Sequence, residues 1–174
     1  MVVMIERKEP TKYKEFPVSL LVRNCYLKRI EYGYGESTDK YEYISLAFNK
    51  DNGWLNARLY NPIRTKYGSQ KEYQSARSRL RRSLEHIAST YLDTEEMVEL
   101  FHVDYTNFKD FAESFVDTLT RKNIKSISID IKTSKYQGRV CLPTSPFFMK
   151  LSNSDEIEFR YSEYELKNIA DDFL

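Results

Sequence analysis

Aromatic and basic side chains alternate with aliphatic ones over residues 40–60. The apolar set falls at every second position on both sides of a turn at 50–53, and it comprises Ile44, Leu46, Phe48, Leu55, Ala57 and Leu59. Because successive side chains of a strand point to opposite faces, this spacing predicts a hairpin with one apolar face. The other face then carries Tyr41, Tyr43, Trp54, Arg58 and Tyr60. Rings beside positive charge are suited to stacking on flat ligands such as nucleobases.

Two interpretations of this ring-bearing face remain open. Aromatic residues of a strand often lie in a core, and a helix or a second sheet would then cover them. The opposite face is already aliphatic, however, and an antiparallel sheet commonly packs on one side and meets water on the other. Asn52 and Gly53, which tolerate positive φ, are predicted to form the turn of the hairpin.

Length and composition indicate a globular chain. It has 174 residues, of which 41% are hydrophobic and 30% charged, which suits one domain with a real core. No apolar run approaches the roughly 20 residues of a membrane span, so we expect a cytoplasmic protein, in the host cytoplasm if it is viral. Cys25 and Cys141 have no metal-ligand spacing and are predicted to be reduced thiols.

Charge is distributed unevenly along the chain. Residues 155–174 contain seven acids and two bases, whereas residues 1–154 contain 19 acids and 25 bases. A basic body with an acidic end suits a polyanionic ligand and a separate protein-binding tail. Ordinary surface charge is the alternative explanation.

The remaining pattern predicts the order of the elements. Residues 1–15 are expected to form a flexible arm, and Phe16 to Arg29 a first strand. A bulge at Lys28-Arg29 would turn Cys25, Leu27 and Ile30 inward, so that Asn24, Tyr26 and Lys28 join the ring-bearing face. Apolar residues three or four apart predict a helix over 70–91, a short helix ending at Leu100, and a third that begins after Thr106 or Asn107.

Arg77, Arg79, Arg81 and Arg82 fall largely off the apolar stripe of the first helix, either as a solvated face or as phosphate contacts. Strand signals return at 126–132 and 139–142, joined through 133–138, and weakly at Ile157 to Tyr161. Three strands, a helical segment at about 70–122 and two further strands predict a mainly β fold with an α insertion. This is the element order of an OB-fold, a five-stranded partly open barrel, here over 16–150 with an acidic tail at 151–174.

The chain resembles the phage-encoded single-stranded DNA-binding proteins of the OB-fold class. The resemblance rests on N-C-Y-L-K-R-I-E-Y at 24–32, Y-E-Y-I-S-L-A-F at 41–48 and W-L-N-A-R-L-Y-N-P at 54–62. It extends to S-L-E-H-I-A-S-T-Y-L at 83–92 and G-R-V-C-L-P-T-S-P-F at 138–147. The acidic end is similar to the tips that recruit replication partners, although it ends on Leu174 and lacks a Gly/Pro/Gln-rich linker.

The resemblance implies that the protein coats single-stranded DNA during replication, recombination or repair, without a cofactor. Bases would stack on Tyr26, Tyr41, Tyr43, Trp54 and Tyr60. Phosphates would be bound by Lys28, Arg58, Arg64, Lys66, Lys135 and Arg139. Replication or recombination proteins would bind the tail through Asp171, Asp172, Phe173 and Leu174. The oligomeric state stays open.

Two other functions are compatible with the sequence. Asp130-Ile131-Lys132 has the D-x-K form of metal-dependent nucleases, although alternating charges are also common on the exposed face of a strand. Alternatively, the rings bind another protein, and the chain is a structural or adaptor protein. His86 and His102 lack ligand spacing, so neither a metal site nor a catalytic residue is expected, and His86 is interpreted as a satisfied surface or core histidine.

Overall fold

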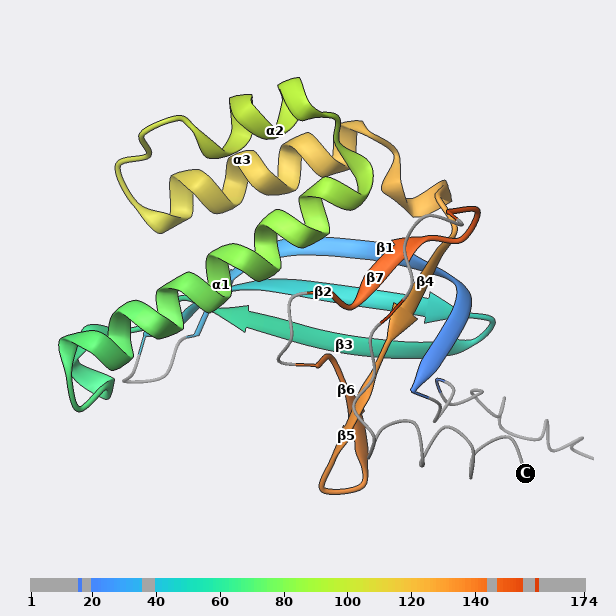
Figure 1. Cartoon of the computed structure of the whole chain (residues 1–174), viewed down its shortest axis with the longest axis horizontal. Helices are drawn as coiled ribbons and strands as arrows, with labels where there is room; N and C mark the ends of the chain where they lie inside the picture. Colours follow the sequence, from blue (N-terminus) through green and yellow to red (C-terminus); the bar gives the residue numbers. More distant parts are fainter. Residues whose placement is uncertain (1–15, 17–19, 36–39, 144–146, 155–158, 160–174) are drawn as a thin grey trace, which may run out of the picture.

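The computed structural model describes residues 16, 20–35, 40–143, 147–154 and 159. Over these residues the strands are β1 (Leu21–Tyr34), β2 (Glu42–Lys50), β3 (Gly53–Tyr60), β4 (Ile129–Lys132), β5 (Ser134–Tyr136), β6 (Arg139–Cys141) and β7 (Met149–Leu151). The helices are α1 (Gln70–Tyr91), α2 (Thr94–Phe101) and α3 (Phe108–Arg121), with short 3-10 turns η1 (Arg64–Lys66) and η2 (Ile124–Ser126). Figure 1 shows the helices gathered on one side of the sheet.

Five strands form an antiparallel sheet in the order β3-β2-β1-β4-β7, and among the described strands β5 and β6 pair with each other in a separate hairpin. A mainly β chain whose helices lie between the third and fourth strands is thus confirmed. The expected barrel is not closed, because no ladder joins the edge strands β3 and β7 among the described residues. The β5–β6 hairpin instead extends from β4 toward the sheet edge, where β6 runs beside β3 (Figure 1).

The β2–β3 hairpin has the register that the alternation predicts. Its aliphatic cross-strand pairs are Ile44 with Leu59, Leu46 with Ala57, and Phe48 with Leu55. The predicted turn at 50–53 is confirmed, because Lys50 pairs with Gly53 and leaves Asp51 and Asn52 between them. The positive φ, however, lies at Asp51 and not at Asn52 or Gly53. Asp51 adopts the left-handed conformation (φ 54°), which short polar residues tolerate. The Asn49 amide holds the turn by donating to the carbonyls of Asp51 (3.1 Å) and Gly53 (3.0 Å).

A bulge in β1 decides which of its side chains face the core. The register with β2 shifts between Leu27 and Arg29, as the inward spacing predicts. Leu27 and Ile30 are therefore both buried although three residues separate them. The strand runs to Tyr34 and begins at Leu21, so the predicted bounds of 16–29 lie about five residues too early. Pairing with β2 continues past the bulge to Tyr34, which accounts for the later end of the strand.

At a second irregularity in β1, a backbone N–H binds a buried carboxylate. The sequence pattern does not predict this irregularity. The register with β4 shifts between Val22 and Cys25, where Asn24 has a left-handed φ of 55°. The Asn24 backbone N–H donates to Asp130 Oδ1 (3.0 Å). The same oxygen accepts a hydrogen bond from the Ser152 hydroxyl (2.9 Å).

The prediction that Asp130 and Lys132 lie on an exposed strand face is wrong. Their side chains are only 7% and 5% exposed, and every residue of β4 is buried. β4 is an interior strand, flanked by β1 and by β7, and the strand at Met149–Leu151 is absent from the sequence prediction. Asp130 is hydrogen-bonded on both sides, to Asn24 of β1 and to Ser152, which follows β7.

Asp130→Ala is expected to destabilise the fold by about 1–3 kcal/mol, because it leaves the Asn24 N–H without its acceptor and removes the hydrogen bond from the Ser152 hydroxyl. Urea denaturation followed by circular dichroism measures this. The control is Asp117→Ala, at an exposed position of α3. An unchanged midpoint for Asp130→Ala would show that the buried carboxylate does not support the sheet.

Each helix begins at a side-chain cap. Ser69 Oγ accepts from the Glu72 N–H (3.2 Å) at the start of α1. Asp93 caps α2 in a capping box with Glu96, and Asn107, one of the two residues predicted at the start of the third helix, caps α3. These caps satisfy backbone donors that the first helical turn leaves unpaired, so the predicted helices start where the sequence indicates.

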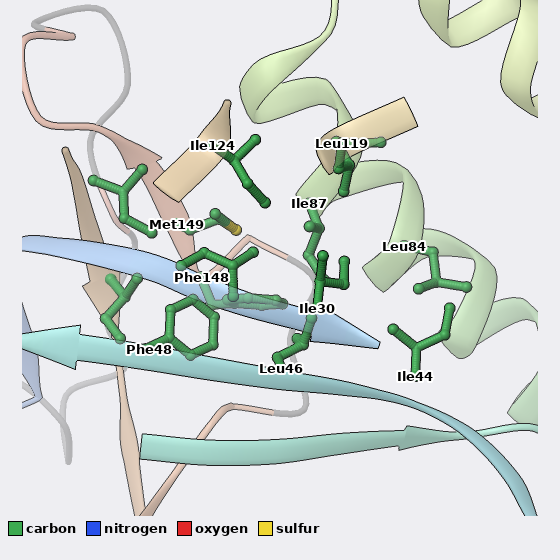
Figure 2. Packing of buried hydrophobic residues seen from close by; sticks show 14 of the residues in the cluster. Ile30, Ile44, Leu46, Phe48, Leu84, Ile87, Leu119, Ile124, Phe148 and Met149 are labelled. Atoms are coloured by element: carbon green, nitrogen blue, oxygen red, sulfur yellow. The ribbon is translucent and has the colours of Figure 1, made fainter. Parts of the chain in front are cut away.

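The core lies between the helices and one face of the sheet, which we call the inner face and which bears Ile44, Leu46 and Phe48. These three side chains are fully buried. Figure 2 shows Ile44 facing Leu84 of α1, whereas Phe48 lies next to Phe148. Leu84, Phe148 and Leu119 of α3 are also buried in this core. The helices therefore cover the aliphatic side of the hairpin, and the opposite side of the same strands is the outer face.

His86 joins α1 to β7. Its Nε2 accepts hydrogen bonds from the backbone N–H groups of Phe148 and Met149, both at 3.0 Å. The rings of Phe147 and Phe148 pack edge-on against the imidazole, with centroids at 5.4 and 5.1 Å. Burial lowers the pKa of His86 to about 4, so the ring is neutral at pH 7. The interpretation of His86 as a satisfied histidine is confirmed.

Some predictions fall on residues that the structure does not describe. These are the arm at 1–15, the strand at Ile157 to Tyr161 apart from Phe159, and the tail residues Asp171, Asp172, Phe173 and Leu174. Within the described part of the chain, no helix has both the length and the apolar character of a membrane span. Cys25 and Cys141 are free thiols, and burial raises the pKa of Cys25 to about 12.

Candidate nucleic-acid interface

The outer face is built from four rows of cross-strand neighbours on β1, β2 and β3. In order along the hairpin they are Tyr26–Asn49–Trp54, Arg29–Ala47–Asn56, Glu31–Ser45–Arg58 and Gly33–Tyr43–Tyr60. None of the described helices packs on this face, because α1 and α3 bury their apolar stripes against the inner face. The predicted rings therefore share a face that no described helix covers.

Three tyrosines gather at one end of the outer face, and we call them the tyrosine cluster: Tyr41, Tyr43 and Tyr60. The Tyr60 ring meets those of Tyr41 and Tyr43 edge-on, with centroids at 5.8 and 5.7 Å, and is 49% exposed. Arg58 lies over the Tyr43 ring, with its Cζ 4.4 Å from the centroid. Gly33 makes room for this arrangement, because any side chain there would collide with the Tyr43 ring. A flat ligand would meet Tyr60 first.

Trp54 stands at the other end of the outer face, beside the hairpin turn. It is 52% exposed, and Tyr26 lies in the same row, partly buried. The Lys28 ammonium is 4.7 Å from the centroid of the Tyr26 ring and donates to the carbonyl of Lys125 (2.9 Å) in η2. This end combines an exposed indole with an anchored positive charge.

The predicted rings form two groups. Trp54 and Tyr60 are six residues apart on β3, which corresponds to about 20 Å at the rise of a strand. Between them the face carries Arg29 and Glu31, whose Nε and Oε1 atoms are 4.0 Å apart, and the small Ala47, which is 1% exposed. A ligand touching both ends must therefore be elongated.

The other predicted basic residues lie away from these rows. Arg64 and Lys66 belong to η1. Arg64 donates from Nε to Gln70 Oε1 (2.7 Å) and from its guanidinium to the Tyr67 carbonyl (3.2 Å), so it helps to hold the connection into α1. Lys135 and Arg139 are exposed near the turn of the β5–β6 hairpin, whose strand β6 contacts β3.

Sequence reasoning missed two exposed side chains of this region. Arg29 follows the bulge in β1 and pairs with Ala47 on the outer face, so the predicted bulge already contained the signal. Tyr136 is 69% exposed and pairs with Arg139. A tight turn at Gln137-Gly138, where φ is 49° and 75°, places Tyr136 at the end of a strand. Gly138 in the sequence was therefore the feature from which the position of Tyr136 could have been predicted.

The D-x-K acid has the surroundings of a structural acceptor. Asp130 is buried and binds Asn24 and Ser152. Among the described residues, no group of three or more His, Cys, Asp or Glu side chains is placed to hold a metal ion. Asp130 therefore already serves as the acceptor for two groups of the protein itself.

The described geometry offers exposed rings, nearby guanidinium groups and an elongated floor. Such a surface suits a flexible chain with flat groups and negative charges. No protein-family model matches this chain and no curated protein matches its sequence, so a function has to be inferred from the geometry of the outer face.

Proposed function

We propose that this protein binds single-stranded DNA along its outer face. The observation that carries the proposal is the half-exposed state of Trp54 and Tyr60, on a sheet face that no described helix covers. The inner face is filled by its own core, so the rings do not serve that core. Exposed aromatic rings on a β surface are the stacking platform of proteins that bind single strands.

In this proposal, bases stack on Trp54 at one end and on Tyr60 with Tyr43 at the other. Each stacked base contributes about 1–3 kcal/mol with little sequence preference, because every base has a π face. Arg29 and Arg58 lie between the ring groups and bind phosphates. Each neutralised phosphate steepens the decrease of log affinity with log salt by about 0.7.

We further infer that the sheet is related to the OB-fold, as the resemblance to phage single-stranded DNA-binding proteins implies. In support, β1 pairs with both β2 and β4, the helices lie between β3 and β4, and the β5–β6 hairpin reaches the β3 edge. OB-folds bind oligonucleotides through strands 2 and 3. Here β2 carries Tyr43, and β3 carries Trp54 and Tyr60. The acidic tail would recruit replication, recombination or repair proteins in the cytoplasm.

Titration of tryptophan fluorescence tests the proposal, because Trp54 is the only tryptophan of the chain. Single-stranded DNA, duplex DNA and single-stranded RNA are compared at about 50 mM and 200 mM salt. We expect single-stranded DNA to quench Trp54 and to bind more weakly at the higher salt. Duplex DNA should quench less, because its bases are already stacked. Unchanged emission with every ligand at the lower salt would contradict the proposal and leave the adaptor interpretation.

A further inference from the structure

A second aromatic surface lies on the helical side of the molecule. A groove of about 540 Å³ runs between α1, the connection from α2 to α3, and the start of α3. Five rings line it, from Tyr73, Phe101, Tyr105, Phe108 and Phe111. The proposed base-stacking face does not include these side chains.

One wall of the groove is positively charged. Arg77 and Arg81, one turn apart on α1, both line it. The Arg77 guanidinium lies 5.7 Å from the centroid of the Tyr73 ring and forms no ion pair with another described residue. The exposed Arg81 is paired with the partly buried Glu85 at 2.7 Å, a contact that solvent screens. The opposite wall carries the carboxylate of Asp104.

The groove meets the tyrosine cluster at the end of the sheet. Asn61 lines the groove and directly follows Tyr60. Its backbone N–H donates to the carbonyl of Glu42 (2.9 Å), the residue after Tyr41. Because neighbouring residues of a strand point to opposite faces, the same strand ends present the tyrosine cluster outward and the groove inward. Only the end of β3 separates the two surfaces.

We propose that a bound single strand continues from Tyr60 around the end of β3 into this groove. The inference rests on the proposed function and extends its path. Bases lie against the rings of Tyr73, Tyr105 and Phe108, while phosphates face Arg77 and Arg81. Base amino groups face Asp104, so negative phosphates and the carboxylate stay on opposite walls. The charge of the α1 wall selects a nucleic-acid strand over an uncharged apolar peptide.

Oligonucleotides of two lengths test this path, because a short strand fits on the outer face alone. Strands of about 5 and about 12 nucleotides lie within the site sizes of single OB-folds. We expect the wild-type protein to bind the longer strand more tightly. In the double variant Arg77→Ala/Arg81→Ala the longer strand should bind about tenfold more weakly, with a salt slope lowered by about 1.4 for two lost phosphates. The shorter strand should bind unchanged and still quench Trp54.

The matched control is Arg79→Ala/Arg82→Ala. It removes the same charge from the same helix at exposed positions that do not line the groove. Circular dichroism verifies that both variants keep the wild-type helix content. Equal binding of the longer strand by all three proteins, equal losses in both variants, or no gain with length in the wild type would overturn the groove inference. Loss of Trp54 quenching by every strand would instead overturn the proposed function.

Discussion

Replacing Trp54 and Tyr60 together by alanine is expected to weaken binding of single-stranded DNA at least about thirtyfold. Each ring stacks one base at about 1–3 kcal/mol, and 1.4 kcal/mol corresponds to a factor of ten in affinity. Both rings are about half exposed, so their removal opens no cavity in the core. The variant loses its tryptophan signal, and fluorescence anisotropy of a labelled oligonucleotide therefore measures its affinity.

Tyr34→Ala is the matched control for this double variant. Tyr34 is 48% exposed, nearly the same as Tyr60, but it pairs with Glu42 outside the four rows of the outer face. We expect it to leave the affinity unchanged. Urea denaturation separates lost binding from lost folding. If the double variant binds like the wild type per folded molecule, the rings of the outer face do not stack bases.

Acidification is expected to remove roughly 3 kcal/mol of stability through His86 alone between pH 7 and pH 4. Burial lowers the pKa of the folded imidazole to about 4, below its ordinary value of 6.5. The contribution is therefore fully present above about pH 6.5, and it is lost as the pH falls toward the folded pKa. Protonated His86 has no acceptor at Nε2, so the N–H groups of Phe148 and Met149 lose their partner.

His86→Gln is the variant that isolates this titration. Its amide oxygen offers an acceptor to β7 but does not ionise. Urea denaturation of both proteins at several pH values between 7.5 and 4 gives the free energy of unfolding. Carboxylates titrate in both proteins, so the difference between the two curves reports the titration of His86. The wild type should therefore lose more stability on acidification than the variant. Parallel curves would show that His86 does not bind its proton differently in the folded and unfolded states.

Local patterns predicted the parts of this fold that depend on near neighbours in the sequence. The alternation at 40–60 predicted the hairpin and its two faces, and the change of spacing after Leu27 predicted the bulge in β1. Helix periodicity and capping residues predicted α1, α2 and α3 to within a few residues. These features follow from the periodicity of apolar side chains and from the hydrogen bonds that backbone groups need at helix ends. Both are determined by a short stretch of chain.

The candidate site was predicted in part. Sequence reasoning placed Tyr43, Trp54 and Tyr60 on one face, but it did not separate Trp54 from the two tyrosines. The alternation of a strand gives the face of each side chain, whereas the rise per residue gives the distance between them, and both are needed. It omitted Arg29 and Tyr136, which the bulge and a tight turn bring to exposed positions. Whether these residues bind DNA stays a prediction.

By itself, the sequence determined the hairpin, its apolar and aromatic faces, and the helices that follow. Tertiary structure alone decided the open sheet, the burial of Asp130, and the meeting of Asn61 with α1 and α3 at one groove. The physical reason is separation along the chain. The Asn24–Asp130 hydrogen bond spans 106 residues and the His86–Phe148 hydrogen bond spans 62, and neither leaves a periodic trace in the residues that form it.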